Sequence, residues 1–389
     1  MYRPNRQNKN GVKIMYVKKL SIIGIIGISL CLFYGCEGPE GPAGITGQDG
    51  VDGVDLTALP PAGTYFSLAV NNNAGDMQFG SFVNYLSFDT ANTSVFSTIP
   101  QIVSVKTETP PEIDGSAASG EWSGSGTTVT LERIEDFEKY DGISPVGVTS
   151  VSVSSMYDET YIYFKLSWSD ADESDEKDKL AYDASSESWS KSGNEDRFYL
   201  MFPITGFPDT DFADGNGCEA LCHYDEASEN GKGYMFTEFS DQLVDTWQWK
   251  ASRANPVGYI HDKHLIYQDV AAFDASADKP KSFSGRKGDQ GLNTYVENKI
   301  GSNGFPNYMS ASDPNANAGY PSFVWDMAPF DASASFSDAA TIPGVFLRYP
   351  TGSNADVVAY GKHNGSGWLV EVRRARNTGN GDDHQFVPE

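Results

Sequence analysis

The chain has few positive charges, few cysteines, few histidines and only one long apolar run. Its 389 residues carry 28 Lys and Arg against 53 Asp and Glu, a formal net charge of −25. Because such an acidic surface repels phosphate backbones, we exclude nucleic acids as partners. A single apolar run also excludes a polytopic membrane protein. The four cysteines and five histidines restrict where redox or metal chemistry can take place.

What the sequence does contain favours short strands. Its 39 glycines and 20 prolines mark many turns, and the segments between them are rich in Tyr, Phe, Val and Thr. Residues 160–168 alternate strictly, with Ile162, Phe164, Leu166 and Trp168 on one face. Only residues 241–253 suggest a helix. We therefore expect an all-β, antiparallel β-sandwich, immunoglobulin-like or carbohydrate-binding-module-like in layout, with long inserted loops and a few short helices. The other strands are predicted at residues 65–70, 81–88, 101–106, 148–154, 197–203, 344–349, 357–360 and 368–374.

The N-terminus carries an export signal. Two lysines precede an apolar run at residues 20–35, which is of signal-peptide length. The run ends in Gly35-Cys36, which resembles a bacterial lipobox whose cysteine is lipidated; an uncleaved N-terminal anchor is the alternative. Glycine then recurs at every third position up to Gly53, as in collagen. The predicted organisation is a signal peptide with lipobox (1–35), a lipidated Cys36 with a collagen-like stalk or trimerising stem (36–63), and a folded domain (64–389).

One motif in the folded domain carries chemistry. Cys218, Cys222 and His223 form C-x3-C-H, one residue longer than the C-x-x-C-H motif that attaches c-type haem. In that motif two thioethers fix the porphyrin and the adjacent histidine ligates the iron. In an exported protein the same two cysteines could instead form a small disulfide. The spacing leaves both interpretations open.

The surroundings of this motif resemble a known family. Several segments occur in the order found in haem-binding β-sandwich domains related to the gamma subunit of ethylbenzene dehydrogenase and of other dimethyl-sulfoxide-reductase-type molybdenum enzymes. These segments are residues 109–115 (TPPEIDG), 121–122 (EW), 166–170, 218–223, 245–250 (DTWQWK) and 367–374. The resemblance implies a sandwich that holds one haem and transfers electrons without substrate chemistry of its own. It also implies a redox partner, either a molybdenum oxidoreductase or other cytochromes.

The resemblance implies axial ligands as well. The family binds b-type haem through a Met and a Lys; Met235 is the nearest match to the former, whereas Val358 occupies the place of the latter. Lys362 and His363 are the closest alternatives to that lysine. If Cys218 and Cys222 attach the porphyrin, the haem is c-type and His223 ligates it. The family domain usually continues with further strands, so we expect either a missing closing strand or one supplied by another segment.

Three further features have two interpretations each. His261 and His264 could ligate iron together with His223, although an exposed loop is the usual setting for such a pair. His363 is expected in an exposed hairpin turn. The acidic run at residues 170–176 could bind Ca²⁺ or form a solvated loop.

Two functions therefore compete. The first is a membrane-tethered, exported haem protein, facing the periplasm or the cell surface, that is not itself an enzyme. The alternative is a carbohydrate-binding or adhesive surface module, since the IDG…W opening also occurs in sugar-binding sandwiches. A hydrolase has little support, because no G-x-S-x-G elbow and no H-E-x-x-H zinc motif is present.

Overall fold

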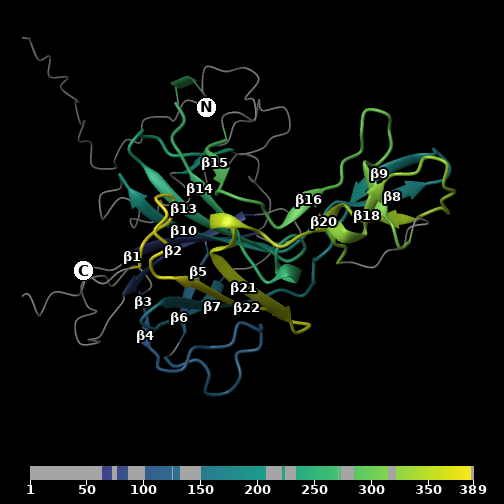
Figure 1. Ribbon diagram of the computed structural model, residues 1–389. Coiled ribbons are helices and arrows are strands. Elements are labelled where there is room, and N and C mark those ends of the chain that lie inside the picture. The colour runs from purple at the N-terminus through teal and green to yellow at the C-terminus, as the bar shows by residue number, and fades with distance from the viewer. Residues whose placement is uncertain are drawn as a thin grey trace, which may run out of the picture. The chain divides into compact units, whose positions relative to one another are not determined.

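Two antiparallel-rich sheets form the body of the protein in the computed structural model (Figure 1). The structure describes residues 64–71, 77–85, 101–124, 126–131, 150–206, 221–223, 234–269, 271–272, 284–313 and 321–386. The predicted signal, Cys36 and the stalk lie outside these residues. Within the described part, no helix is long and apolar enough to cross a bilayer.

The first sheet has seven strands in the order β15-β14-β13-β10-β1-β2-β3. All its pairs are antiparallel except β2 with β3. Its strands are β1 (Thr64–Asn71), β2 (Met77–Tyr85), β3 (Gln101–Val103), β10 (Arg197–Thr205), β13 (Leu243–Lys250), β14 (His261–Leu265) and β15 (Arg286–Gly288).

The second sheet has six strands in the order β21-β22-β7-β6-β4, and β5 also pairs with β6. β22 therefore has a hydrogen-bonded neighbour on each side, β21 and β7. Its strands are β4 (Val105–Lys106), β5 (Thr127–Thr130), β6 (Ser150–Tyr157), β7 (Tyr161–Ser169), β21 (Val357–His363) and β22 (Gly367–Ala375).

Smaller elements fill the insertions between these strands. They are β8 (Lys179–Asp183), β9 (Ser188–Ser192), β11 (Cys222–His223), β12 (Tyr234–Met235), β16 (Tyr295–Glu297), β17 (Tyr308–Ser310), β18 (Met327–Pro329), β19 (Thr341–Ile342), β20 (Val345–Leu347), and the 3-10 helices η4 (Asn255–Val257), η6 (Val324–Asp326) and η7 (Gly352–Ala355).

The core lies between the two sheets and combines aliphatic side chains with a group of large aromatic rings. On β7 the predicted inward face is confirmed: Ile162, Phe164 and Leu166 are fully buried and Trp168 is 5% exposed. They pack against β10 and β13; the Trp168 ring, for example, lies edge-on to Phe198 and Trp249, with ring centroids 6.1 and 6.0 Å apart. Burying each such side chain contributes roughly 1.5–3 kcal/mol to the free energy of folding. The all-β sandwich prediction is thus confirmed.

The helix expected at residues 241–253 is wrong. The structure has β13 there, hydrogen-bonded to β10 and β14 over most of its length. Trp247 and Trp249 are two residues apart and both fully buried, the period of a strand with one face on the core. Between two strands of a packed sheet, that period outweighs weak local propensity.

The opening motif of the domain and the last strand meet in space. Glu371 on β22 is fully buried and accepts hydrogen bonds from the amides of Asp114 and Gly115 and from the Trp122 indole, at 3.1, 2.8 and 2.6 Å. Gly115 has a φ of 74°, and a Cβ there would lie 2.9 Å from the backbone nitrogen of Lys362. The IDG…W segment is therefore held against the second sheet by its hydrogen bonds to Glu371.

Candidate functional site

The Cys-His motif ends in a short hairpin with the predicted methionine. β11 pairs with β12 so that Cys222 faces Met235 and His223 faces Tyr234 as Cα partners. Directly opposed residues in an antiparallel pair lie about 4.5–5.5 Å apart at Cα. The Phe236 amide donates to the Leu221 carbonyl at 3.0 Å, which extends the pairing at one end. Cys218 lies outside the described residues, and with it the choice between disulfide and thioether.

Met235 is fixed by tight packing of its backbone. It is 9% exposed, and its carbonyl accepts a hydrogen bond from the Gly285 amide at 2.9 Å. A Cβ at position 285 would lie 2.4 Å from the Ile266 carbonyl oxygen, so only glycine allows this approach. Leu221 and Phe236 beside it are also buried, at 1% and 0% exposure. The hairpin thus has an apolar base at the end of β14.

Lys362 and His363 lie at the other end of the sandwich. Gly361 bonds to Asn255, which also accepts from the Trp249 indole at 3.2 Å, so this end of β21 lies beside the end of β13. Met235 lies near the beginning of β13, where Val244 pairs with Leu265. Val244 and Trp249 are separated by about 17 Å of strand at 3.4 Å per residue. The structure therefore does not bring Lys362 or His363 to Met235.

His363 also has no nitrogen available for a metal ion. Its Nε2 lies 2.9 Å from the Asp170 carbonyl oxygen, to which it donates, and its Nδ1 accepts from the Gly365 amide at 3.2 Å. Its side chain is 3% exposed and packs on Trp368, with ring centroids 5.3 Å apart. The expected exposed turn is thus wrong for this side chain, because the indole covers it. Lys362 is about half exposed and lies 4.0 Å from an Asp114 oxygen.

His261 and His264 are both on β14 and point to opposite faces of the sheet. The expected exposed loop is wrong, because β14 is hydrogen-bonded on both sides and His261 is only 4% exposed. Residues three apart on a strand lie on opposite faces. His261 Nδ1 lies 2.7 Å from Lys250 Nζ, and His264 Nδ1 lies 2.6 Å from Asp289 Oδ1. The two imidazoles therefore cannot ligate one ion.

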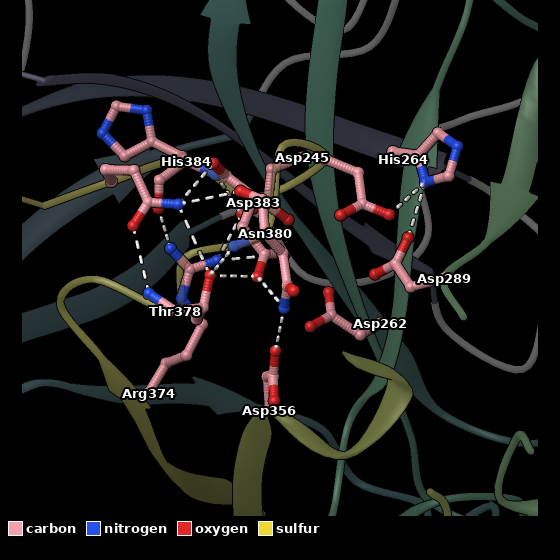
Figure 2. Close-up of polar contacts among 12 residues, drawn as sticks. Asp245, Asp262, His264, Asp289, Asp356, Arg374, Thr378, Asn380, Asp383 and His384 are labelled. Carbon is pink, nitrogen blue, oxygen red and sulfur yellow. Dashed lines mark hydrogen bonds and ion pairs between the residues drawn. The ribbon is translucent and has the colours of Figure 1, made fainter. Parts of the chain in front are cut away.

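On the His264 side of β14, four buried aspartates come together, which we call the buried acidic cluster: Asp245, Asp262, Asp289 and Asp383 (Figure 2). Asp245 and Asp262 lie on β13 and β14, Asp289 follows β15, and Asp383 lies beyond β22. One ligand atom from each of Asp245, Asp262 and Asp383 lies within 4.8 Å of the others. Asp289, His264 and the more exposed Asp382 form a second such group.

Arg374 on β22 is the fully buried cation of this region. Its Nη1 lies 2.5 Å from Asp245 Oδ2 and 3.7 Å from Asp383 Oδ1, and its Nη2 donates to the His384 carbonyl. The guanidinium also lies 4.8 Å from the centroid of Trp247. Arg374 thereby connects the second sheet to the first and holds the segment that contains Asp383.

The carboxyl pKa values in the cluster are raised. Burial raises the pKa of Asp245 to about 7, since desolvation together with the neighbouring Asp383 outweighs the Arg374 guanidinium. The pKa of Asp262 is raised well above its usual value by burial and by Asp245 and Asp289. Burial likewise raises the pKa of Asp289, against the opposing effect of His264, whose own pKa is raised by its hydrogen bond to Asp289.

The acidic run at residues 170–176, for which Ca²⁺ binding and a solvated loop were the two interpretations, forms no such group. Of the described His, Cys, Asp and Glu side chains, those of residues 170–176 do not converge in threes. Instead Asp170 accepts from the Asp172 amide at 3.3 Å, and the Ser174 amide donates to Asp196 at 2.9 Å. Sequence reasoning missed the acidic cluster because 245 and 262 were assigned to a helix and a loop. The available signal was Asp245 two residues before Trp247, on what the structure shows to be an apolar face.

A comparison with known protein families shows which family the chain belongs to. The model of the family described as ethylbenzene dehydrogenase matches residues 124–389, more than half of the chain. The chain belongs to the ethylbenzene dehydrogenase family. No curated protein matches it.

In this member of the ethylbenzene dehydrogenase family, Met235, the nearest match to the expected methionine, is the Cα partner of Cys222, and Val358, at the position expected for the lysine, bridges to Tyr259. A thioether, a thiol and an imidazole from one hairpin are groups of the right kind for haem attachment and ligation. These residues fit a haem, with ligands different from a Met/Lys pair.

Proposed function

We propose that this chain is an exported, membrane-tethered haem protein that transfers electrons to or from a molybdenum oxidoreductase or another cytochrome and catalyses no reaction of its own. Family membership supports the association with molybdenum enzymes. The observation that carries the haem proposal is the register of β11 and β12, in which Cys222 of the C-x3-C-H motif faces Met235. A cysteine of the motif and the expected methionine thus meet in one pair of short strands, in a chain with only four cysteines.

In this proposal each residue of the β11–β12 hairpin has its own role in holding the haem. A haem bound there would supply one-electron redox chemistry. Cys218 and Cys222 would attach it, and His223 or Met235 would ligate it. Buried Leu221 and Phe236 exclude water from the base of the hairpin and so favour the less charged redox state of any group held there. The net charge of −25 would steer a basic patch on the redox partner toward the domain.

The location is proposed from the N-terminal residues alone. Lys18 and Lys19, the apolar residues 20–35 and the Gly35-Cys36 pair are consistent with export and lipidation of Cys36. Radiolabelled palmitate incorporation into wild type but not into a Cys36→Ser variant would test the anchor. Equal labelling of both proteins would contradict it.

A spectrum tests the haem. The full chain, expressed with cytochrome-maturation machinery, should give a Soret band and a pyridine haemochrome. Acid-acetone extraction should leave the porphyrin on wild type and release it from a Cys218→Ala, Cys222→Ala double variant. Met235→Ala should shift or remove the Soret band, whereas Met309→Ala, a control methionine that is 3% exposed on β17, should not. A colourless product would overturn the proposal.

A second candidate function, carbohydrate binding, has one observation in its favour. Trp325 is 68% exposed and stacks on Phe323 with ring centroids 4.3 Å apart and planes at 10°. Exposed, rigid aromatic faces are the surfaces on which sugar rings pack. Glycan binding that is lost in Trp325→Ala by a colourless protein would favour this function.

A further inference from the structure

The buried acidic cluster contains more negative charge than the protein around it balances. The side chains of Asp245, Asp289 and Asp383 have no exposed area, and Asp262 is likewise 0% exposed. The cations that contact them in the described residues are Arg374 and, when protonated, His264. Four carboxylates against at most two cations would leave uncompensated charge in a buried region, which costs several kcal/mol per ion.

Three of these carboxylates are each satisfied at one oxygen only. Asp245 Oδ2 accepts from Arg374 and from the His384 amide at 2.5 and 3.0 Å. Asp383 Oδ2 accepts from Thr378 Oγ1 at 2.6 Å and Asn380 Nδ2 at 3.3 Å. Asp262 Oδ1 accepts from the Lys263 amide at 3.1 Å.

The second oxygen of each of these carboxylates has no hydrogen-bond donor. Asp245 Oδ1, Asp262 Oδ2 and Asp383 Oδ1 are all buried without a hydrogen-bond partner, as is Asp289 Oδ2, and the contact of Asp383 Oδ1 with Arg374 Nη1 is an ion pair at 3.7 Å. Buried polar atoms in native proteins are nearly always satisfied, so a group of orphan oxygens in one place indicates a missing ligand. Figure 2 shows the Asp262 carboxylate pointing into the space between Asp289 and the Asp245–Asp383 side. The protein therefore positions one oxygen of each group and leaves the other free.

We propose that the buried acidic cluster binds one divalent cation, Ca²⁺, through the free oxygens of Asp245, Asp262 and Asp383, with Asp289 next to them. This site is separate from the proposed haem hairpin. The ligands come from β13, β14 and the segment after β22, so the ion would join the first sheet to residues 376–386.

The donor set selects Ca²⁺ over other metals. All the free ligand atoms are carboxylate oxygens, which hard cations prefer. The imidazole of His264, which a zinc or copper site would use, does not belong to the group formed by Asp245, Asp262 and Asp383, and its Nδ1 lies 2.6 Å from Asp289 Oδ1. Mg²⁺ retains several waters, whereas these oxygens are buried. The raised carboxyl pKa values in the cluster agree with a site that needs a cation to stay ionised at neutral pH.

The ion would hold the last part of the chain in place. Phe386 is 1% exposed and packs in the core against Phe164, Phe202 and Trp247. The segment that brings it there is fixed by Asp383 and by the Arg374–His384 contact. A Ca²⁺ ion on Asp383 would add a direct link to the first sheet, so its removal should loosen this segment before the rest of the sandwich.

Calcium titration of the full chain tests the site. After removal of metal with EGTA, wild type should bind one Ca²⁺ with a Kd of about 10⁻⁶ to 10⁻³ M by calorimetry, and its Tm should rise with added Ca²⁺. Asp262→Asn should weaken binding by at least about tenfold and abolish the Tm shift. Asp172→Asn, in the exposed acidic run, is the matched control and should bind as wild type does.

Terbium luminescence supplies a second readout that does not need the aspartate variant to fold. Trp247 is the cross-strand partner of Asp262, so exciting tryptophan should sensitise emission from bound Tb³⁺. Trp247→Phe should reduce that emission while Ca²⁺ still competes the Tb³⁺ away. Absence of stoichiometric Ca²⁺ binding by wild type, or loss of binding in Asp172→Asn with retention in Asp262→Asn, would overturn the proposal. Neither result bears on the haem spectrum.

Discussion

The two faces of β13 and β14 bury charges of opposite sign. The inner face holds the buried acidic cluster, against Arg374. The outer face holds a basic cluster, which we define as the buried Lys250 and His261 with the partly buried Arg253 and Lys263, against the buried Glu195, which pairs with Arg253. Neighbouring residues such as Asp262 and Lys263 go to opposite clusters because side chains alternate along a strand.

The two clusters solve the same electrostatic problem in different ways. On the outer face, burial lowers the pKa of Lys250 and of His261, so these groups can become neutral, and Lys250 Nζ lies 5.4 Å from the Tyr295 ring centroid. On the inner face the free oxygens have no donors, and the proposed remedy is a cation. Buried cations can thus be accommodated by losing a proton and by aromatic rings, whereas convergent carboxylates need either protons or a metal ion.

The largest expected effect is the loss of the inner-face cation. Arg374→Met should lower the free energy of unfolding by about 3–5 kcal/mol, because it leaves Asp245 and Asp383 buried without their guanidinium. Urea denaturation in EGTA measures it. Arg373→Met, the next residue on β22, loses a ring contact to Tyr161 at 5.0 Å and should cost under about 1 kcal/mol. Equal losses of unfolding free energy in Arg374→Met and Arg373→Met would contradict the special role of the buried guanidinium of Arg374.

The pH dependence of the metal-free protein should be next in size. Asp245 has a folded pKa of about 7, above the unfolded value of about 3.9, so the folded state binds the extra proton. Stability is therefore fully present below about pH 4 and is lost as pH rises through about 7, by about 2–4 kcal/mol. Saturating Ca²⁺ should flatten this slope. Identical slopes with and without Ca²⁺ would separate the ion from these carboxylates.

Removal of a positive charge from the outer face should stabilise the folded protein. Lys250→Met should raise the free energy of unfolding at neutral pH by about 1 kcal/mol, since it removes a desolvated amine and keeps the apolar stem. The lowered folded pKa of Lys250 means that wild type gains stability as pH rises toward about 10.4, so the advantage of the variant should shrink there. Lys191→Met, at a half-exposed site, should change stability by under about 0.5 kcal/mol. A destabilised Lys250→Met would show that its contacts to His261 and Tyr295 outweigh desolvation.

The smallest expected effect is the difference between the two histidines of β14 in how their substitution changes stability with pH. The raised pKa of His264 stabilises the fold below about pH 6.5 and is lost at higher pH, so His264→Gln should cost about 1 kcal/mol at acidic pH and less above it. The lowered pKa of His261 has the opposite sign, so the cost of His261→Gln should grow as pH rises through about 6.5. Parallel pH profiles for the two variants would refute the assignment of the rings to different faces.

Much of the fold could be predicted because the signal was local. The alternation at residues 160–168 identified β7 and its inward face, and the turn-rich composition identified an all-β protein. Residues 241–253 were misassigned because charged and polar residues interrupt the apolar positions of β13. Those residues face two clusters that other strands build, which no local window contains. The order of the resembling segments identified the family, which the match over residues 124–389 confirms.

For the candidate sites, too, local sequence patterns gave one part of the information and the tertiary structure the other. Sequence by itself determined the residue types: a C-x3-C-H motif, a methionine, a strong negative charge and alternating strands. Only the tertiary structure decided that Cys222 meets Met235, that Lys362 and His363 lie at the far end of β13, and that Asp383 joins Asp245 and Asp262. The physical reason is that strand pairing and sheet packing bring together residues from different segments, some of them more than a hundred positions apart, while sequence patterns report only the period of one strand.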